Sequence, residues 1–72
     1  MIRVWTHAIL VGSLPCKVQP IARRLAMEGL PWAVWYRDGW RASVAGIGGR
    51  RGWSPDTALA RAESEYQTSR DD

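Results

Sequence analysis

The chain has 72 residues, the size of one small domain, and its apolar fraction of 46% is typical of a globular protein rather than a disordered one. The single cysteine, Cys16, excludes an internal disulfide and a cysteine-cluster zinc site, and the longest apolar run, residues 8–11, is far too short to span a bilayer. Residues 1–61 hold nine basic and three acidic side chains, a net +6, whereas residues 62–72 carry −3. We therefore expect one basic, cytoplasmic domain over residues 1–67 and a polar tail over residues 68–72, with no membrane contact.

The first third of the chain predicts a strand and a short helix. Residues 2–11 are rich in β-branched and aromatic side chains and end at a Gly-Ser break, which favours a strand. Pro20 suits the first position of a helix that runs to Glu28. Gly29 can end this helix in a left-handed conformation, and Leu30 can then fold back on Leu25.

Residues 32–37 and 40–45 predict two strands joined at Asp38-Gly39, because this dipeptide is favoured in two-residue hairpin turns. Such a turn would pair Arg37 with Trp40, Trp35 with Ala42 and Ala33 with Val44 on the face that we expect to cover the helices. The other face would then carry Tyr36 opposite Arg41, Val34 opposite Ser43 and Trp32 opposite Ala45. Arg37 with Trp40, and Arg41 with Tyr36, would be cross-strand cation–π pairs.

A glycine-rich loop with two arginines, residues 46–52, follows the hairpin. It lacks the endings of a Walker loop and of a dinucleotide fingerprint. Two interpretations remain open: an anion site beside the next helix, or a flexible connection. Ser54-Pro55-Asp56 then predicts the start of a helix over residues 55–67, with Ser54 as its N-cap.

Nothing in the sequence predicts catalysis. His7 and Cys16 are the only residues with the chemistry of a base and a nucleophile, and no orienting group or oxyanion hole accompanies them. One His, one Cys and no acidic cluster at ligand spacing do not predict a metal site. We expect a protein that is not an enzyme and uses neither a cofactor nor a metal.

Residues 40–62 resemble the strand–glycine turn–helix unit of two small families. Gly52, Ser54, Ala58, Leu59 and Ala62 match the spacing of the Gly-x-Thr-x-x-x-Ala-Leu-x-x-Ala helix start in antitoxins of the HicAB type. The same Gly-x-Ser, Ala and Ala positions are similar to the end of a double-stranded RNA-binding domain. Pro55 and Asp56 stand where that family has helix-start lysines that hold RNA phosphates. The resemblance covers about a third of the chain and implies an α+β topology.

These elements predict an α+β fold of order β-α-β-β-α, with a three-stranded, mainly antiparallel sheet and two helices on one face. Nine of the ten basic residues are Arg, which favours bidentate or stacking contacts. A GC-rich genome would produce the same excess, so both explanations stay open. Aromatic and guanidinium groups concentrate at a candidate partner-binding set: Trp32, Tyr36, Arg37, Trp40, Arg41, Arg50, Arg51 and Trp53.

The expected function is docking on a host protein or a nucleoprotein partner through the hairpin and the Gly-Arg loop. In size, composition and lack of catalytic motifs, the chain resembles phage or mobile-element inhibitors, anti-CRISPR proteins among them. The alternative is a nucleic-acid-binding module with Arg37, Arg41, Arg50 and Arg51 on phosphates and aromatic rings on bases. A homodimer formed through the sheet fits either function.

Overall fold

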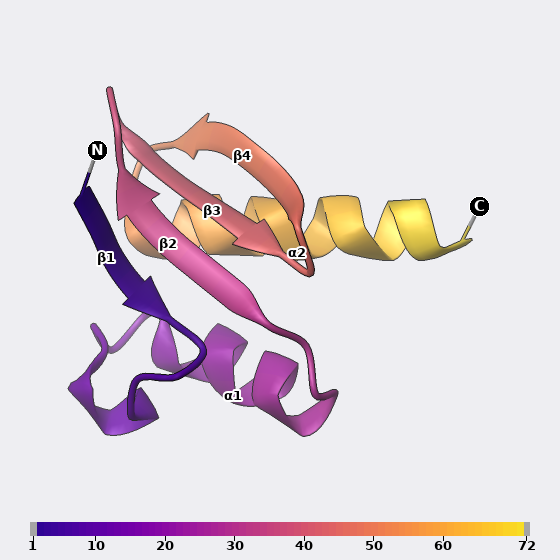
Figure 1. The fold of residues 1–72 in the computed structure, drawn as a ribbon, viewed down its shortest axis with the longest axis horizontal. Coiled ribbons are helices and arrows are strands. Elements are labelled where there is room, and N and C mark those ends of the chain that lie inside the picture. The colour runs from indigo at the N-terminus through magenta and orange to yellow at the C-terminus, as the bar shows by residue number, and fades with distance from the viewer. Residues whose placement is uncertain (1, 72) are drawn as a thin grey trace.

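The computed structural model describes residues 2–71 as an antiparallel four-stranded sheet with two α-helices (Figure 1). Its elements follow one another along the chain as β1 (Ile2–Thr6), the 3-10 helix η1 (Val11–Ser13), α1 (Gln19–Met27), β2 (Trp32–Tyr36), β3 (Trp40–Val44), β4 (Ile47–Gly52) and α2 (Pro55–Asp71). The strands lie in the sheet in chain order. The α+β class is confirmed, but the prediction of three strands is wrong because the expected glycine loop forms β4.

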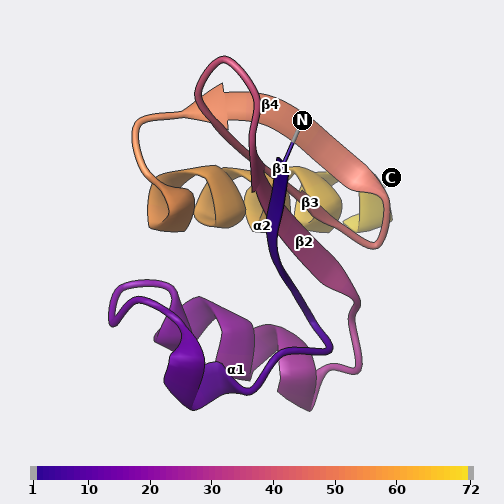
Figure 2. The ribbon, with the colours of Figure 1, turned by 60° about the vertical axis from the view of Figure 1, so that its left-hand side comes forward.

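Both helices cover the same face of the sheet, which we call the helix face. Its buried side chains in β2 and β3 form one core cluster with buried side chains of α1 and α2. In the views of Figures 1 and 2, α2 lies along β3 and β4, and α1 lies below it. The alternating side chains of β2 and β3, such as Trp35 and Arg41, are only partly buried and lie on what we call the open face.

The sequence predicts the C-terminal end of α1 and the N-terminal end of α2. Gly29 has φ +69° and ends α1 in a Schellman motif, in which Leu30 N–H donates to the Leu25 carbonyl at 3.0 Å and Gly29 N–H donates to that of Ala26 at 3.0 Å. Ser54 caps α2, because its Oγ accepts from Thr57 N–H at 3.4 Å. Both predictions are confirmed. Residues 68–71, predicted as a polar tail, are exposed and continue α2, whereas residue 72 lies outside the described residues.

The first strand is shorter than predicted. β1 ends at Thr6, and the residues after it form a turn that leads into η1 rather than a strand as far as residue 11. Val4 is an extra residue in β1, because Arg3 pairs with Trp35 and Trp5 pairs with Val34. The bulge places Trp5 on the helix face beside Val34. No helix within residues 2–71 is long and apolar enough to cross a membrane.

The predicted register of the β2–β3 hairpin is wrong by one residue. Tyr36 pairs with Trp40, so the loop holds three residues, 37–39, and its left-handed positions are Asp38 at φ 55° and Gly39 at φ 118°. Because strand side chains alternate between faces, a shift by one residue exchanges the two faces of β2. Trp32 and Val34 are therefore buried on the helix face, where Ala33 and Trp35 had been expected.

Strand β4 forms because a second tight turn precedes it. Ala45 and Gly46 both have positive φ, 51° and 81°, and they join the paired residues Val44 and Ile47 as a two-residue hairpin loop requires. The Ala45 N–H also donates to the Pro31 carbonyl at 2.7 Å. A left-handed alanine is uncommon, so the Ala-Gly pair gave no turn signal in the sequence. A register shift further along β4 leaves Gly49 and Arg50 opposite one residue of β3.

Glycines in β4 allow α2 to lie directly on that strand. A Cβ added at Gly52 would lie 2.8 Å from Ala58 N and 2.9 Å from Ala58 Cα, both backbone atoms. At Gly48, an added Cβ would lie 2.6 Å from the Ala42 carbonyl oxygen and 3.0 Å from the Ala62 Cβ. Because Ala58 and Ala62 are also small, the helix approaches the strand closely along this line.

An ion pair joins the exposed sides of α1 and α2. The Arg24 guanidinium donates from Nε to Glu63 Oε2 at 2.9 Å and from Nη2 to Glu63 Oε1 at 2.6 Å. This bidentate contact, through hydrogen bonding first and charge attraction second, raises the pKa of Arg24 above its ordinary value. A longer contact of 3.9 Å links Arg70 to Glu28. Surface pairs of this kind add little stability, but they neutralise two of the arginines.

We expect Gly52→Ala to lower the free energy of unfolding by about 1–3 kcal/mol, because the new methyl group must displace the backbone of α2. Gly12→Ala is the matched control: a Cβ there meets no atom within 4 Å, and stability should change by less than about 0.5 kcal/mol. Urea denaturation followed by circular dichroism measures both. Equal stability of the two variants would contradict the close packing of α2 on β4.

Candidate functional site

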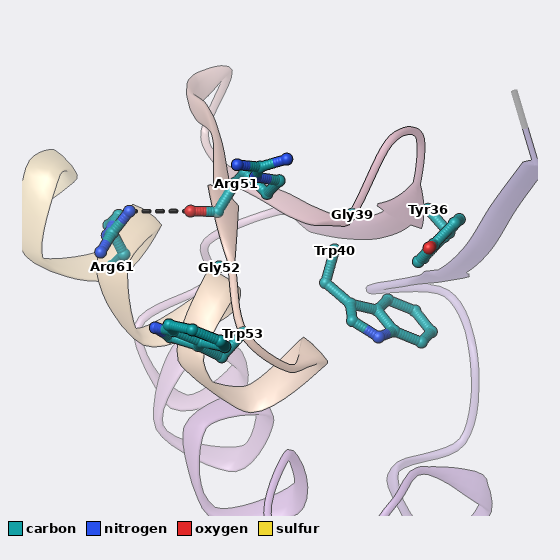
Figure 3. Close-up of a pocket in the computed structure, with 7 residues that line it drawn as sticks. All are labelled: Tyr36, Gly39, Trp40, Arg51, Gly52, Trp53 and Arg61. Atoms are coloured by element: carbon teal, nitrogen blue, oxygen red, sulfur yellow. Dashed lines mark hydrogen bonds between the residues drawn. The ribbon is translucent and has the colours of Figure 1, made fainter.

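A groove of about 490 Å³ opens where the β2–β3 hairpin, the end of β4 and α2 meet (Figure 3). We call it the tryptophan groove. Trp53 and Arg61 lie on one side of it, and Tyr36 and Trp40 lie on the other, with the end of β4 between them. Its lining residues are Tyr36, Gly39, Trp40, Arg51, Gly52, Trp53 and Arg61.

Two aromatic side chains, Trp40 and Tyr36, line one wall of the groove, and Trp5 stacks on Trp40. The indole of Trp40 stacks on that of Trp5 with ring centroids 5.7 Å apart and planes 3° from parallel. The ring of Tyr36 meets Trp40 edge-on, with centroids 5.3 Å apart and planes at 81°. Both are favourable aromatic geometries, and the three strands that supply the residues hold them in place. Trp40 is therefore fixed in position, while Tyr36 remains 53% exposed.

The other wall carries the most exposed large apolar side chain among the residues described. Trp53 is 94% exposed, although its neighbours in the chain are well placed: Gly52 ends β4 and Ser54 caps α2. Gly52 packs directly against Ala58, and the Trp53 indole, in the short segment between strand and helix, lies in solvent. A tryptophan held in water in this way adds little to the stability of the fold.

The two arginines at the groove, Arg51 and Arg61, contact backbone carbonyls. Arg61 donates from Nη1 to the Arg51 carbonyl at 2.8 Å, and Arg51 donates from Nη1 to the Asp38 carbonyl at 3.4 Å. The side chain of Arg51 also lies against Gly39, where an added Cβ would overlap its Cδ. Within the described part of the chain, neither arginine has a carboxylate within 4 Å, in contrast to Arg24, Arg50 and Arg70. Backbone carbonyls orient these guanidinium groups without neutralising them.

The structure brings together four of the eight predicted site residues, namely Tyr36, Trp40, Arg51 and Trp53. Trp32, predicted to lie at a binding surface, is only 4% exposed. It belongs to the core because of the register shift in β2. Arg37 lies in the hairpin loop, and Arg41 lies on the open face. Arg50 turns towards α2, where its Nε is 3.5 Å from Glu65 Oε1.

Two predicted interactions are replaced by others. Tyr36 pairs with Trp40, and Trp35 pairs with Arg41, so the register separates both of the expected cation–π pairs. Residues 47–52, for which an anion site or a flexible connection had been left open, pair as a strand that leads to the start of α2. The Ser54 hydroxyl is engaged there with Asp56 Oδ1 at 2.7 Å and with Thr57 Oγ1 at 2.9 Å.

Sequence reasoning missed Arg61 and Trp5 as parts of the site. Arg61 lies four residues before Glu65 on α2, but Glu65 contacts Arg50 and Arg61 contacts the Arg51 carbonyl. This contact could not be predicted without β4, because the strand at residues 47–52 places the Arg51 carbonyl beside α2. Trp5 reaches the groove wall because of the bulge at Val4, which no sequence pattern indicates.

The residues with reactive side chains lie apart from the groove lining. Cys16 is exposed and free, and His7 is exposed with Nδ1 3.3 Å from the Trp32 carbonyl oxygen. Across residues 2–71, no group of three or more His, Cys, Asp or Glu side chains could hold a metal ion. The chemistry that the groove offers is aromatic contact and fixed positive charge.

No family model matches the sequence, and no curated protein or solved structure is significantly similar to it.

We expect Trp53→Phe to remove the part of the tryptophan fluorescence that acrylamide quenches most readily, because Trp53 alone of the described tryptophans is fully open to solvent. The emission maximum should move to shorter wavelength, and the free energy of unfolding should change by less than about 0.5 kcal/mol. Steady-state quenching and urea denaturation measure the two effects. If the variant quenches like the wild type, Trp53 is covered in solution.

Proposed function

We propose that the chain is a non-catalytic binding protein that docks on a host protein, alone or within a nucleoprotein complex, through the tryptophan groove. The observation that carries this proposal is the 94% exposure of Trp53 beside a groove lined by two further aromatic side chains. Tryptophan, tyrosine and arginine are the residue types that most often dominate the energy of protein interfaces. Exposed aromatic patches on small domains commonly mark contact sites.

The chemistry of the groove defines the kind of partner that it fits. Trp40 and Tyr36 provide an aromatic wall for an apolar side chain, and the Trp53 indole can close over it from the opposite side. Arg51 and Arg61 add positive charge that no carboxylate within residues 2–71 neutralises at 4 Å or less. A partner surface that presents an apolar side chain next to acidic ones satisfies both features. Docking of this kind blocks a surface without chemistry, as an inhibitor of the anti-CRISPR type would.

Affinity capture from a bacterial lysate, with and without nuclease treatment, tests this proposal. We expect the wild type to retain a discrete protein, and Trp53→Ala and Arg61→Glu to lose it. Trp35→Ala and Arg23→Glu are the matched controls, because they make the same changes on the open face and on the exposed side of α1. With the captured partner purified, Trp53→Ala should weaken binding by about 2 kcal/mol or more, which is about 30-fold.

Two outcomes would contradict the proposal. A partner that Trp53→Ala and Arg61→Glu still retain does not use the groove. A partner that disappears after nuclease treatment is held through nucleic acid instead. Circular dichroism of each variant shows that a loss of binding is not a loss of folding.

A further inference from the structure

The open face of the sheet carries a second surface, which shares Arg51 with the tryptophan groove but contains neither Trp53 nor Arg61. One register row crosses all four strands: Arg3 pairs with Trp35, Trp35 with Arg41, and Arg41 with Arg51. The neighbouring row pairs Thr6 with Ala33, Ala33 with Ser43, and Ser43 with Gly48. Because side chains of paired residues share a face, Trp35 and Arg41 lie next to the small residues Ala33 and Ser43. They do so on the face of the sheet that neither helix covers.

Trp35 differs from the other tryptophans in its surroundings. It is partly buried, yet it is not among the aromatic side chains that pack against the core, which include Trp5 and Trp40. Arg41 lies directly opposite it on β3. Paired side chains on neighbouring strands are about 5 Å apart, so an indole and a guanidinium group stand side by side on this face.

Two hydrogen bonds to backbone carbonyls hold the Arg41 guanidinium in place. Its Nε donates to the Arg37 carbonyl at 2.8 Å, and its Nη1 donates to the Gly49 carbonyl at 2.7 Å. These bonds use two of the five N–H donors of the group and leave the others for a ligand. Within the described residues no carboxylate lies within 4 Å of Arg41 or Arg51, and the described register positions of this face include no acidic residue.

We infer that the open face binds a single-stranded nucleic acid, with a base stacked on Trp35 and phosphates held by Arg41 and Arg51. Positive charge that no carboxylate of the described residues pairs with at 4 Å or less is complementary to a phosphate backbone, and an aromatic platform accepts any base. An acidic peptide would use the charges but has no need of the indole beside Arg41. A duplex presents its bases stacked and paired, so it cannot use Trp35 as a platform.

Fluorescence anisotropy with labelled 15-residue oligothymidylate and oligouridylate tests this inference. We expect Trp35→Ala to weaken binding about 5- to 100-fold, as loss of one stacked base does, without changing the salt dependence. Arg41→Gln should reduce the slope of log K against log salt by about 0.7, the value for one phosphate on a single strand. Arg41→Lys keeps the charge and should keep the slope.

Matched variants on other surfaces complete the test. Trp53→Ala and Arg23→Gln remove a tryptophan and an arginine away from the open face, and both should bind the oligonucleotides within twofold of the wild type. The inference fails if Trp35→Ala binds as tightly as Trp53→Ala, or if a 15-base-pair duplex binds as well as the single strands. It also fails if a polyglutamate peptide displaces the oligonucleotides at equal charge concentration. Because the Trp53 and Trp35 variants report on different surfaces, these outcomes leave the proposal for the groove untouched.

Discussion

The register of the β2–β3 hairpin is the constraint on which the rest of this structure depends. The pairing of Tyr36 with Trp40 decides which alternate residues of β2 enter the core. It buries Trp32 and Val34 under the helices and leaves Trp35 on the open face. With the two-residue turn that Asp38-Gly39 suggests, each of these side chains would have changed face. The three-residue loop therefore places Trp32 in the core and leaves Trp35 partly exposed on the open face.

Close packing of α2 on β4 is the second determinant, and it explains why the groove exists. The missing side chains of Gly48 and Gly52 let the helix reach the strand backbone at Ala58 and Ala62. This contact brings Arg61 to the Arg51 carbonyl. The same contact leaves the short connection between strand and helix on the outside of the fold, with its tryptophan in solvent. The wall opposite is built by strand pairing and aromatic stacking, so both walls are fixed by the backbone.

The sequence predicted those elements whose signals are local. Gly29 ends α1 and Ser54 begins α2 as expected, because a left-handed glycine and a capping hydroxyl act within one turn of helix. The location of the hairpin was equally clear. Its register was not, because a turn of two or three residues fits the same dipeptide and the choice depends on packing across the sheet. The sequence did not predict β4, because its glycines are typical of a loop. They form a strand here because β3 pairs with β4 along its edge and α2 packs on its face.

Six of the nine arginines divide into two groups by the atoms that hold their guanidinium groups, and this division bears on the origin of the excess. Arg24 and Arg50 face carboxylates of α2, and Arg70 of α2 faces Glu28 at the end of α1. Arg41, Arg51 and Arg61 are oriented by backbone carbonyls instead. A GC-rich genome raises the number of arginines, but it does not sort them by partner. Carbonyl bonds fix the direction of a guanidinium group and retain its charge, which is the arrangement that a surface needs in order to bind an anionic group without first breaking an ion pair.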